Sequence, residues 1–229
     1  MLCDPERTGI DVGAKVGMYT YRIRASSSDV LAFEPIPLFH TMLKKVFDGK
    51  RGRIERVAAS CSHGTATLRM PFDHAGDAQF GRSTIDRANP LIHHQVARTE
   101  DIEVETRTID EYQLPSVGFI KVDVEGHEVA VLEGAANTID RHKPNLLIEC
   151  NDDHQPDGRA KLTAWLDAHG YDAFFVDGHA VKSIDQYDRV EHWDKQTIEN
   201  FICIHRSRPD VHVKLVARVA VARMGKVPQ

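Results

Sequence analysis

The sequence predicts an α/β protein with a doubly wound, mostly parallel sheet, and three observations support this fold class. Short apolar segments alternate with helix-like segments over most of the 229 residues. A β-branched run ends at a glycine turn near residue 13, and several later apolar runs end in carboxylates. Alternation of this kind is typical of βαβ units, whose strands are parallel and whose ligands bind at the carboxyl ends of the strands.

The first element is a strand that ends within Ile10–Gly17, where Asp11 precedes the glycine turn. Gly13 permits a tight turn and the close approach of a ligand, and a helix is expected after Gly17. The free N–H groups of the first helical turn would face that ligand. The spacing D-x-G-x-x-x-G differs from the dinucleotide fingerprint G-x-G-x-x-G, and its carboxylate suits an ammonium group better than a pyrophosphate. An ordinary βα turn is the alternative interpretation.

The second strand covers residues 30–33 and is followed by Glu34. Glu34 lies 21 positions after Gly13, where a doubly wound fold places the carboxylate that holds two ribose hydroxyls. Pro35 stops the strand, and apolar residues at helical spacing predict the next helix, namely Ile36, Phe39, Leu43 and Val46. A solvated acid at a strand end is the alternative interpretation of Glu34.

The middle of the chain predicts a hairpin and a long loop. Residues 53–60 and 65–70 are expected to form two strands joined by a turn at residues 62–64. Residues 71–101 are rich in Gly, Asp, His and Arg and poor in large apolar side chains. Long loops in compact domains are usually functional or mobile, so this segment is interpreted either as a lid over the substrate or as a flexible surface loop.

The second half of the chain continues the alternation of strands and helices. Apolar runs predict strands at residues 103–108, 117–125, 144–150, 172–176 and 200–205. The last two have no obvious crossover helix between them, so we expect an antiparallel hairpin at the sheet edge. Five carboxylates fall at strand ends, namely Asp11, Glu34, Asp123, Glu125 and Glu149. This is more than folding requires and indicates a binding site at one rim of the sheet.

Composition and charge argue against several classes of protein. The formal net charge of −5 argues against nucleic-acid binding as the main task. No apolar run is long enough to span a membrane, and charged residues interrupt the N-terminal segment, so no signal peptide is predicted. The four cysteines form no C-x-x-C pair, which favours buried free thiols over a zinc site. These features favour a cytoplasmic protein.

We divide the chain into a main domain at residues 1–205 and a basic tail at residues 206–229. The tail carries six basic residues and one acidic residue, with several valines between them. It could lie on an anionic surface or on a partner, but a packed or disordered terminus is the preferred interpretation.

Three motifs resemble the FkbM family of S-adenosylmethionine-dependent methyltransferases. They are I-D-V-G-A-x-x-G at residues 10–17, F-E-P at residues 33–35 and K-x-D-x-E-G-x-E-x-x-x-L-x-G-A at residues 121–135. Leu146–Glu149 and Asn200–Phe201 also match the family pattern, so the resemblance runs from about residue 9 to residue 205. The third motif is the most specific of these.

The resemblance implies a class I methyltransferase fold with a seven-stranded sheet whose last strand is antiparallel. It implies that S-adenosylmethionine contacts Asp11, Gly13, Ala14, Gly17, Glu34, Ala59 and Ser60. Asp11 would face the methionine ammonium group directly or through water, Glu34 would hold the ribose, and residues 59–60 would border the adenine. Family members commonly methylate hydroxyl groups, so the implied partner is a small-molecule acceptor, either a sugar or a secondary metabolite.

Methyl transfer to a hydroxyl group needs an aligned acceptor oxygen and a group that removes its proton. Asp123 and Glu125 alternate on a strand, so their side chains share one face. One of them, or His127, is predicted to be the general base. Alternatively, Asp123 and Glu125 would hold a divalent metal together with Glu149 or His154. The metal-free interpretation is preferred, because the sequence does not fix a ligand geometry.

Two features depart from the family pattern. Lys15 stands where the family usually has Asn, and a cation near a sulfonium is unfavourable, so we expect its side chain to point to solvent. The chain also starts almost at the first motif, whereas many relatives have an N-terminal segment that helps to cover the site. We therefore expect weaker cofactor binding or weaker enclosure of the substrate.

Two other functions stay open at this point. A nicotinamide-dependent oxidoreductase is disfavoured by the missing G-x-G-x-x-G and by Asp11. A non-catalytic, ligand-binding relative is favoured by Lys15 and the short N-terminus. The acceptor is undetermined because the residues that select it would lie in the unpatterned segment 71–101, and the sequence leaves open whether the chain forms a homo-oligomer.

Overall fold

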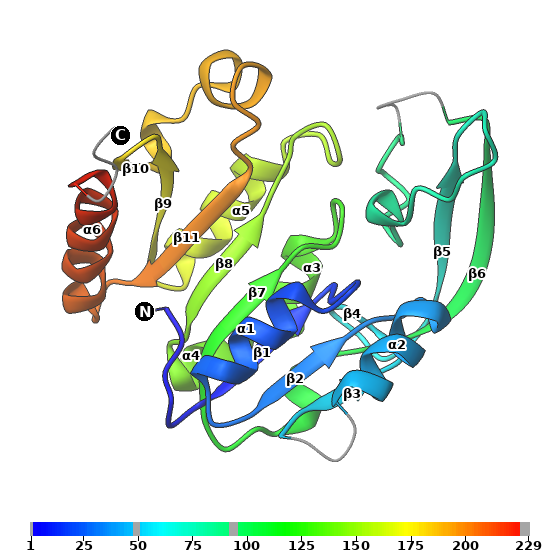
Figure 1. Ribbon diagram of the computed structural model, residues 1–229, viewed down its shortest axis with the longest axis horizontal. Helices are drawn as coiled ribbons and strands as arrows, with labels where there is room; N and C mark the ends of the chain where they lie inside the picture. Colours follow the sequence, from blue (N-terminus) through cyan, green and yellow to red (C-terminus); the bar gives the residue numbers. More distant parts are fainter. Residues whose placement is uncertain (1, 48–50, 92–95, 225–229) are drawn as a thin grey trace.

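A computed structural model describes residues 2–47, 51–91 and 96–224. Within these ranges, an eight-stranded sheet has the order β10-β9-β11-β8-β7-β1-β2-β3 (Figure 1). Its strands are β1 (Thr8–Val12), β2 (Val30–Phe33), β3 (Arg53–Glu55), β7 (Val117–Val122), β8 (Asn145–Glu149), β9 (Tyr171–Asp177), β10 (Ala180–Ser183) and β11 (Asn200–His205). Neighbours from β3 to β8 are parallel, and β11 is antiparallel to β8 and β9. The predicted doubly wound sheet with an antiparallel end is confirmed.

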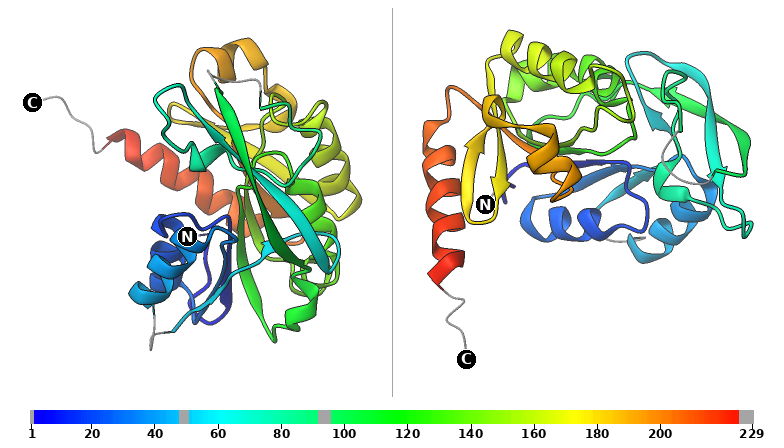
Figure 2. Two further views of the ribbon diagram at one scale, coloured as in Figure 1. Left: turned by 90° about the vertical axis from the view of Figure 1, so that its right-hand side faces the viewer. Right: turned by 90° about the horizontal axis from the view of Figure 1, so that it is seen from above.

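Helices cover both faces of this sheet (Figure 2). One face carries α1 (Met18–Ser26) and α2 (Pro37–Phe47), and the other carries α3 (Glu128–Glu133), α4 (Ala136–His142) and α5 (Gly158–Ala168). Successive residues of a strand point to opposite faces of the sheet. Phe119 therefore packs with Ile23 of α1, whereas Ile120 belongs to the core beneath α3–α5. Short helical turns are η1 (Phe80–Arg82), η2 (Asp110–Tyr112), η3 (Ile184–Gln186) and η4 (Val190–Asp194).

The strand order reverses between β1 and β7, which makes their carboxyl ends the switch point of the sheet. Ligands of doubly wound folds bind at such a point. Gly13 follows β1 with φ of 78°, and a Cβ atom there would lie 2.0 Å from the backbone oxygen of Asp123, which follows β7. Glycine is therefore required for the two loops to touch, and the resulting contact forms the base of the candidate site.

A second sheet of three strands flanks the main one, with β6 (Arg98–Arg107) between β4 (Ala58–Ala59) and β5 (Gly64–Phe72). The antiparallel ladder between β5 and β6 pairs nine residues on each strand and projects beside the main sheet (Figure 1). We call residues 73–91 and 96–97, which lie between these strands, the β5–β6 insert. The insert folds back on β5, where Arg69 and Thr84 exchange two backbone hydrogen bonds of 2.9 and 3.1 Å.

The structure corrects three details of the predicted strand pairing. The hairpin expected between residues 53–60 and 65–70 is wrong. Strand β3 pairs with β2 in the main sheet, and β5 pairs with β6 in the second sheet. The expected loop 71–101 is shorter, since β5 continues to Phe72 and β6 begins at Arg98. The last two predicted strands do pair, but β11 lies between β8 and β9, and β10 is an eighth, edge strand where seven were expected.

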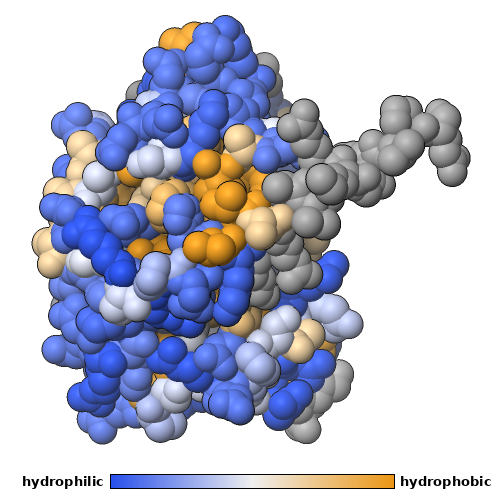
Figure 3. Space-filling view, turned by 90° about the vertical axis from the view of Figure 1, so that its left-hand side faces the viewer, coloured by the Kyte–Doolittle hydropathy of each residue, from blue (hydrophilic) through white to orange (hydrophobic). Residues whose placement is uncertain are grey.

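The segment predicted as a basic tail contains α6 (Pro209–Met224), which packs Val211 and Leu215 against Ile204 of β11. Figure 3 shows this face of the molecule, where hydrophobic residues appear among hydrophilic ones. Val213 and Val216 stay exposed on the described part of α6. Among residues 2–47, 51–91 and 96–224, no helix has both the length and the apolar character needed to cross a bilayer.

The close contact between the end of α3 and the strand end at Ser60 gives a test of the fold. A Cβ atom at Gly134 would lie 1.9 Å from the backbone oxygen of Ser60. We therefore expect Gly134→Ala to lower the free energy of unfolding by about 1–3 kcal/mol, as overpacking does, in a urea titration. Gly64→Ala is the matched control, because its Cβ atom would meet only the Thr106 hydroxyl at 3.7 Å. Equal effects of the two substitutions would contradict this packing.

Candidate active site

The turn after β1 is fixed by its backbone. The N–H groups of Gly13 and Ala14 both donate to the carbonyl of Phe33 at 3.1 Å. Gly17 has φ of 83°, and a Cβ atom there would lie 2.4 Å from the Leu43 side chain. Ala14 and Gly17 are buried, so they support the turn, whereas Gly13 lines a cleft above it.

Glu34 is almost fully buried at the end of β2 and faces the same cleft. Its Oε2 accepts a hydrogen bond from the backbone N–H of Lys15 at 2.7 Å, and its Oε1 accepts one from that of Ile36 at 2.8 Å. Burial raises the pKa of this carboxyl although both hydrogen bonds oppose the shift. Each carboxylate oxygen has a second lone pair, so Glu34 can still accept hydrogen bonds from two hydroxyls of a ligand.

The cleft beside Glu34 has an apolar wall to which the end of β2, the second sheet and the insert all contribute. This wall consists of Phe33, Ile36, Val57, Ala58, Ala59, Leu68, Phe80 and Ile85. Phe80 packs edge-to-face on Phe39 of α2, with 5.0 Å between the ring centroids. The open space in the cleft is about 60 Å³. An apolar wall next to a buried carboxylate suits a nucleoside, whose base is flat and whose ribose carries two hydroxyls.

Ser60 and His127 close one end of the cleft. Ser60 Oγ and His127 Nε2 are 2.9 Å apart, and His127 caps the N-terminus of α3. Burial lowers the pKa of His127, which keeps the imidazole neutral near pH 7. Ala59 and His127 line the cleft, and Ser60 lies behind them through its hydrogen bond with His127. The contact of residues 59–60 with an adenine stays a prediction.

Asp11 lies beneath the glycine turn and is fully buried between the sheet and α1. Its Oδ2 accepts a hydrogen bond from Thr20 Oγ1 at 2.5 Å, and its Oδ1 lies 3.6 Å from Lys121 Nζ. The Lys121 ammonium also donates to the carbonyl of Gly13 at 3.0 Å and lies 3.1 Å from Asp123 Oδ2. Asp11 therefore helps to position Lys121, which in turn binds the carbonyl of Gly13 in the turn. The predicted contact of Asp11 with a ligand ammonium group stays a prediction.

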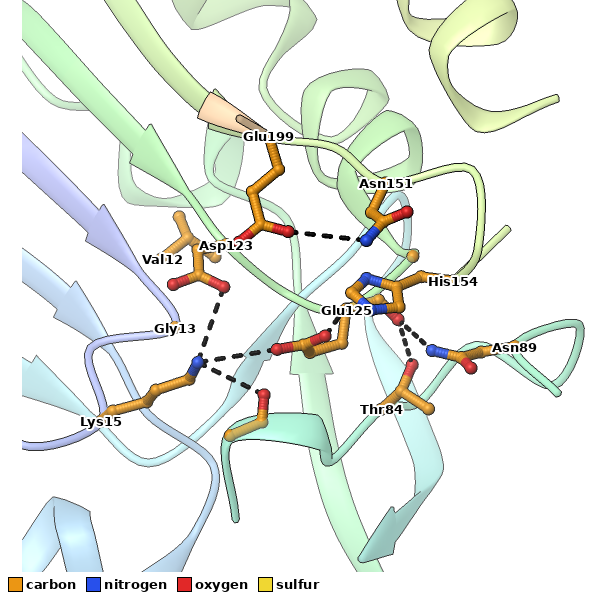
Figure 4. Close-up of polar contacts among 12 residues, drawn as sticks. Val12, Gly13, Lys15, Thr84, Asn89, Asp123, Glu125, Asn151, His154 and Glu199 are labelled. Carbon is orange, nitrogen blue, oxygen red and sulfur yellow. Dashed lines mark hydrogen bonds and ion pairs between the residues drawn. The ribbon is translucent and has the colours of Figure 1, made fainter. Parts of the chain in front are cut away.

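The expectation that Lys15 points to solvent is wrong. Its Nζ lies 3.7 Å from Asp123 Oδ1 and 3.6 Å from Glu125 Oε1, and it donates to the carbonyl of Gly81 in the insert at 3.3 Å (Figure 4). Desolvation disfavours the ammonium here, but the charges of Asp123, Glu125 and Glu149 outweigh it and raise the Lys15 pKa. The left-handed backbone of Lys15, with φ of 47°, turns the side chain toward these acids.

Glu125 combines a left-handed backbone conformation with a buried side chain. It has φ of 57°, a conformation that costs energy in a residue other than glycine, and its side chain is 8% exposed. Its carbonyl accepts hydrogen bonds from Thr84 Oγ1 and Asn89 Nδ2 of the insert, both at 2.8 Å. Its Oε2 lies 3.2 Å from His154 Nδ1 (Figure 4). Burial raises the pKa of Glu125 to about 8 despite the opposing charge of Lys15.

Two further carboxylates complete an acidic cluster at the strand ends, Glu149 as the last residue of β8 and Glu199 just before β11. Oxygen atoms of Asp123, Glu125 and Glu149 lie within 4.8 Å of one another. Burial and the neighbouring charges of Asp123, Glu199 and Glu125 raise the pKa of Glu149 to about 8. Such an oxygen set can hold a divalent cation, but the Lys15 ammonium already lies beside Asp123 and Glu125.

A larger cavity of about 770 Å³ opens on the other side of Glu125. Its walls come from the insert, the end of β8 and the η4 region, and its polar lining residues are Gln79, Arg82, Asn89, Glu125, Glu149, Asn151, Asp153, His154, Trp193, Asp194 and Glu199. Glu125 and Phe80 line both this cavity and the cleft. The two spaces therefore share Glu125 and Phe80 as a common boundary.

Comparisons with known proteins agree with this geometry. The chain is 30% identical over 133 residues to the hexuronic acid methyltransferase AglP of Haloferax volcanii, a match that covers 56% of this chain and 50% of that protein. It is 25% identical over 142 residues to Methyltransferase 1 of Beauveria bassiana, covering 55% of this chain and 57% of that protein. The chain thus spans about half the length of the curated relatives it matches.

The crystal structure of methyltransferase FkbM from Methylobacillus flagellatus KT has a similar fold, with a TM-score of 0.57 and 17% sequence identity. The similarity covers 88% of this chain and 44% of that one. The family model described as the methyltransferase FkbM domain matches residues 11–173, from the glycine turn into β9. Most of the chain lies within this match, and the chain therefore belongs to the FkbM family of S-adenosylmethionine-dependent methyltransferases.

Proposed function

We propose that this chain transfers a methyl group from S-adenosylmethionine to a hydroxyl group of a sugar or secondary metabolite. The nucleoside would lie in the cleft beside Glu34, and the acceptor would lie in the larger cavity. The position of Glu125 is the observation that carries this proposal, since this residue lines both spaces. A proton-accepting group is needed at such a boundary, because the hydroxyl must lose its proton as it attacks the methyl carbon.

Glu125 is the best of the three predicted general bases. Asp123 is held between the ammonium groups of Lys121 and Lys15, at 3.1 and 3.7 Å, and it does not line the acceptor cavity. His127 lines the cleft but not the cavity, and its Nε2 is bound to Ser60. Glu125 has a raised pKa and faces the acceptor side. We assign the proton transfer to Glu125 and a supporting role at the adenine side to His127.

The other site residues are assigned roles in cofactor binding and methyl transfer from their positions. S-adenosylmethionine, when bound, supplies an electrophilic methyl group on a sulfonium centre. Glu34 would hold the ribose hydroxyls, and the apolar wall would enclose the base. Asp123 would hold Lys121 and Lys15 in place at the mouth of the cleft. Glu125 would take the acceptor proton while the oxygen–carbon bond forms and the carbon–sulfur bond breaks.

The insert is proposed to move when the nucleoside enters. Ligand pockets usually enclose about 300 Å³ or more, whereas the open space beside Glu34 is about 60 Å³. Phe80 of the insert lines this space and packs on Phe39 and on the apolar cluster beneath it, which contains Ile36, Ala58, Leu68 and Val104. An outward shift of Phe80 would make room for the base. This supports the interpretation of the predicted loop as a lid.

A hydroxyl-rich acceptor fits the cavity lining. Carboxylates, Asn89, Asn151 and the Trp193 indole offer both hydrogen-bonding groups and an aromatic surface. One curated relative is named a hexuronic acid methyltransferase, which gives a sugar acceptor weak support. Membership of the FkbM family argues against the nicotinamide-dependent alternative. A non-catalytic relative would bind the cofactor without transferring a methyl group. The assay of methyl transfer described below distinguishes it from an enzyme.

The cofactor site is tested by binding. We expect S-adenosylhomocysteine to bind the native chain with micromolar affinity and Glu34→Ala to weaken binding about 10-fold to 100-fold, because buried charge-assisted hydrogen bonds are lost. Titration calorimetry, with and without Mg²⁺, measures both. Glu55→Ala is the matched control, since Glu55 ends the neighbouring parallel strand and does not line the cleft. No binding to the native chain would rule out the proposed function.

The base is tested by the pH dependence of methyl transfer, measured with labelled S-adenosylmethionine and a panel of sugar acceptors. Only the deprotonated carboxylate accepts a proton, so the rate should rise with pH and level off above the Glu125 pKa of about 8. Glu125→Gln should lower the rate at least about 100-fold and abolish this rise, with little change in S-adenosylhomocysteine affinity. A variant that keeps the rise would assign the base to another group.

A further inference from the structure

The large apolar side chains that are exposed in the described part of the chain are unevenly distributed. Nine of these ten side chains lie on α1, α2, α6 or the turn just before α1, and the tenth, Val190, lies in η4. Met18, Val213 and Tyr21 are 75%, 66% and 58% exposed. The described helices α3, α4 and α5 expose no large apolar side chain. Single exposed apolar residues are normal, but their concentration on three helices indicates an interaction surface.

The three helices lie on one side of the main sheet, opposite α3–α5 (Figure 2). We call the surface formed by α1, α2, α6 and the turn before α1 the α1–α2–α6 face. The Arg24 guanidinium of α1 lies 5.5 Å from the centroid of the Phe47 ring of α2. Leu2 packs against the apolar cluster beneath α1 and also against the one beneath α6. These contacts join the three helices into one continuous surface.

This face is also basic. Helices α1, α2 and α6 together contain seven Lys or Arg residues and one acidic residue, Asp210. Helices α3, α4 and α5 on the opposite side contain four acidic and three basic residues. Arg22, Lys44 and Lys45 are exposed beside the apolar residues. Because the whole chain has a formal net charge of −5, positive charge is concentrated on one face of an acidic chain.

We propose that the α1–α2–α6 face binds the surface of a membrane that contains anionic lipids. The basic side chains would contact the headgroups, and Met18, Tyr21, Met42 and Val213 would enter the interfacial region beneath them. Surfaces that combine exposed apolar side chains with Lys and Arg bind this region, and each basic residue adds about 5-fold to the affinity. Tyr suits the region because its ring is apolar and its hydroxyl is polar. This inference goes beyond the proposed function and does not rest on it.

Other occupants fit the face less well. A two-fold dimer would place the face against itself, so the basic residues of the two copies would repel one another. A nucleic acid would match the charge, but interfaces with nucleic acids are polar and offer no apolar surface to Met18 and Val213. An anionic membrane complements both the basic charge and the apolar side chains.

The face extends to the candidate active site. Val16 is 58% exposed in the turn that follows Gly13. The Tyr19 ring centroid lies 5.1 Å from the Lys121 ammonium, which binds the carbonyl of Gly13. A membrane bound to this face would therefore lie beside the turn at the base of the cleft. Met42 and Val213 line neither the cleft nor the larger cavity, so they can be changed without altering the site.

Co-sedimentation of the native chain with lipid vesicles tests this inference. We compare vesicles of phosphatidylcholine with vesicles in which about one third of the lipid is phosphatidylglycerol. At low salt, the affinity for the anionic vesicles should be at least about 10-fold higher, because several basic residues contact their surface. Raising the salt concentration to about 0.5 M should remove most of this difference by screening. Equal binding to both vesicles, or binding to neither, would overturn the proposal.

Apolar variants locate the contact. The double substitution Met42→Gln and Val213→Gln should lower the affinity for anionic vesicles at least about 10-fold, because two exposed side chains lose their contact with lipid. Val190→Gln is the matched control, since Val190 is 53% exposed and lies outside the α1–α2–α6 face. A loss of equal size in the control would contradict the assignment.

Charge variants test the electrostatic part. Lys44→Glu with Lys45→Glu should lower the affinity for anionic vesicles at least about 10-fold. The matched control is Arg141→Glu with Lys161→Glu, which reverses two exposed charges on α4 and α5 of the opposite side. Equal losses in the two double variants would show a general effect of net charge and overturn the assignment to this face.

Two further results would assign the face to another partner. If the substitutions at Met42 and Val213 turned a dimer into a monomer in analytical ultracentrifugation and left vesicle binding unchanged, a second copy would occupy the face. If a short DNA duplex bound the native chain more tightly than anionic vesicles did, the face would serve a nucleic acid. Either result would overturn the proposal. Every variant should bind S-adenosylhomocysteine within about 3-fold of the native chain, which separates lost membrane binding from unfolding.

Discussion

The site depends on one buried cation, the Lys121 ammonium at the switch point of the sheet. It lies between Asp11 of β1 and Asp123 at the end of β7, and it donates to the carbonyl of Gly13. Strands β1 and β7 are neighbours in the sheet but far apart in sequence, so Lys121 joins the glycine turn to the acid-rich strand end. Removing one partner of such a buried network leaves an uncompensated charge, which typically costs about 3–5 kcal/mol.

Lys15 extends this network from the sheet to the β5–β6 insert. Its backbone N–H holds Glu34, its ammonium lies beside Asp123 and Glu125, and it donates to the carbonyl of Gly81. One residue thus contacts the ribose-type carboxylate, the proposed base and the proposed lid. Because these contacts share a side chain and its backbone, opening of the insert would change the environment of Glu125.

The fold was largely predictable because its signals are local. Gly13, Glu34 and Asp123 follow apolar strands at fixed spacings, and the structure brings them together at one rim. The orientation of Lys15 was not predictable, since it depends on a left-handed backbone and on acids more than 100 positions away. Phe80 and Glu199 carried no motif, and only the β5–β6 ladder and the antiparallel β8–β11 pairing place them at the site. Non-local pairing of this kind leaves no period in the sequence.

Charge balance, more than shape, distinguishes the two halves of the site. On the Asp123 side, the ammonium groups of Lys121 and Lys15 lie 3.1 and 3.7 Å from the carboxylate. On the Glu149 and Glu199 side, the described residues supply no such partner within ion-pair distance. Burial and the neighbouring carboxylates raise the pKa of Glu149 to about 8, so proton uptake removes part of the repulsion at this wall near pH 7. The two halves of the site therefore relieve the repulsion between carboxylates in different ways, by ion pairs around Asp123 and by proton uptake at Glu149.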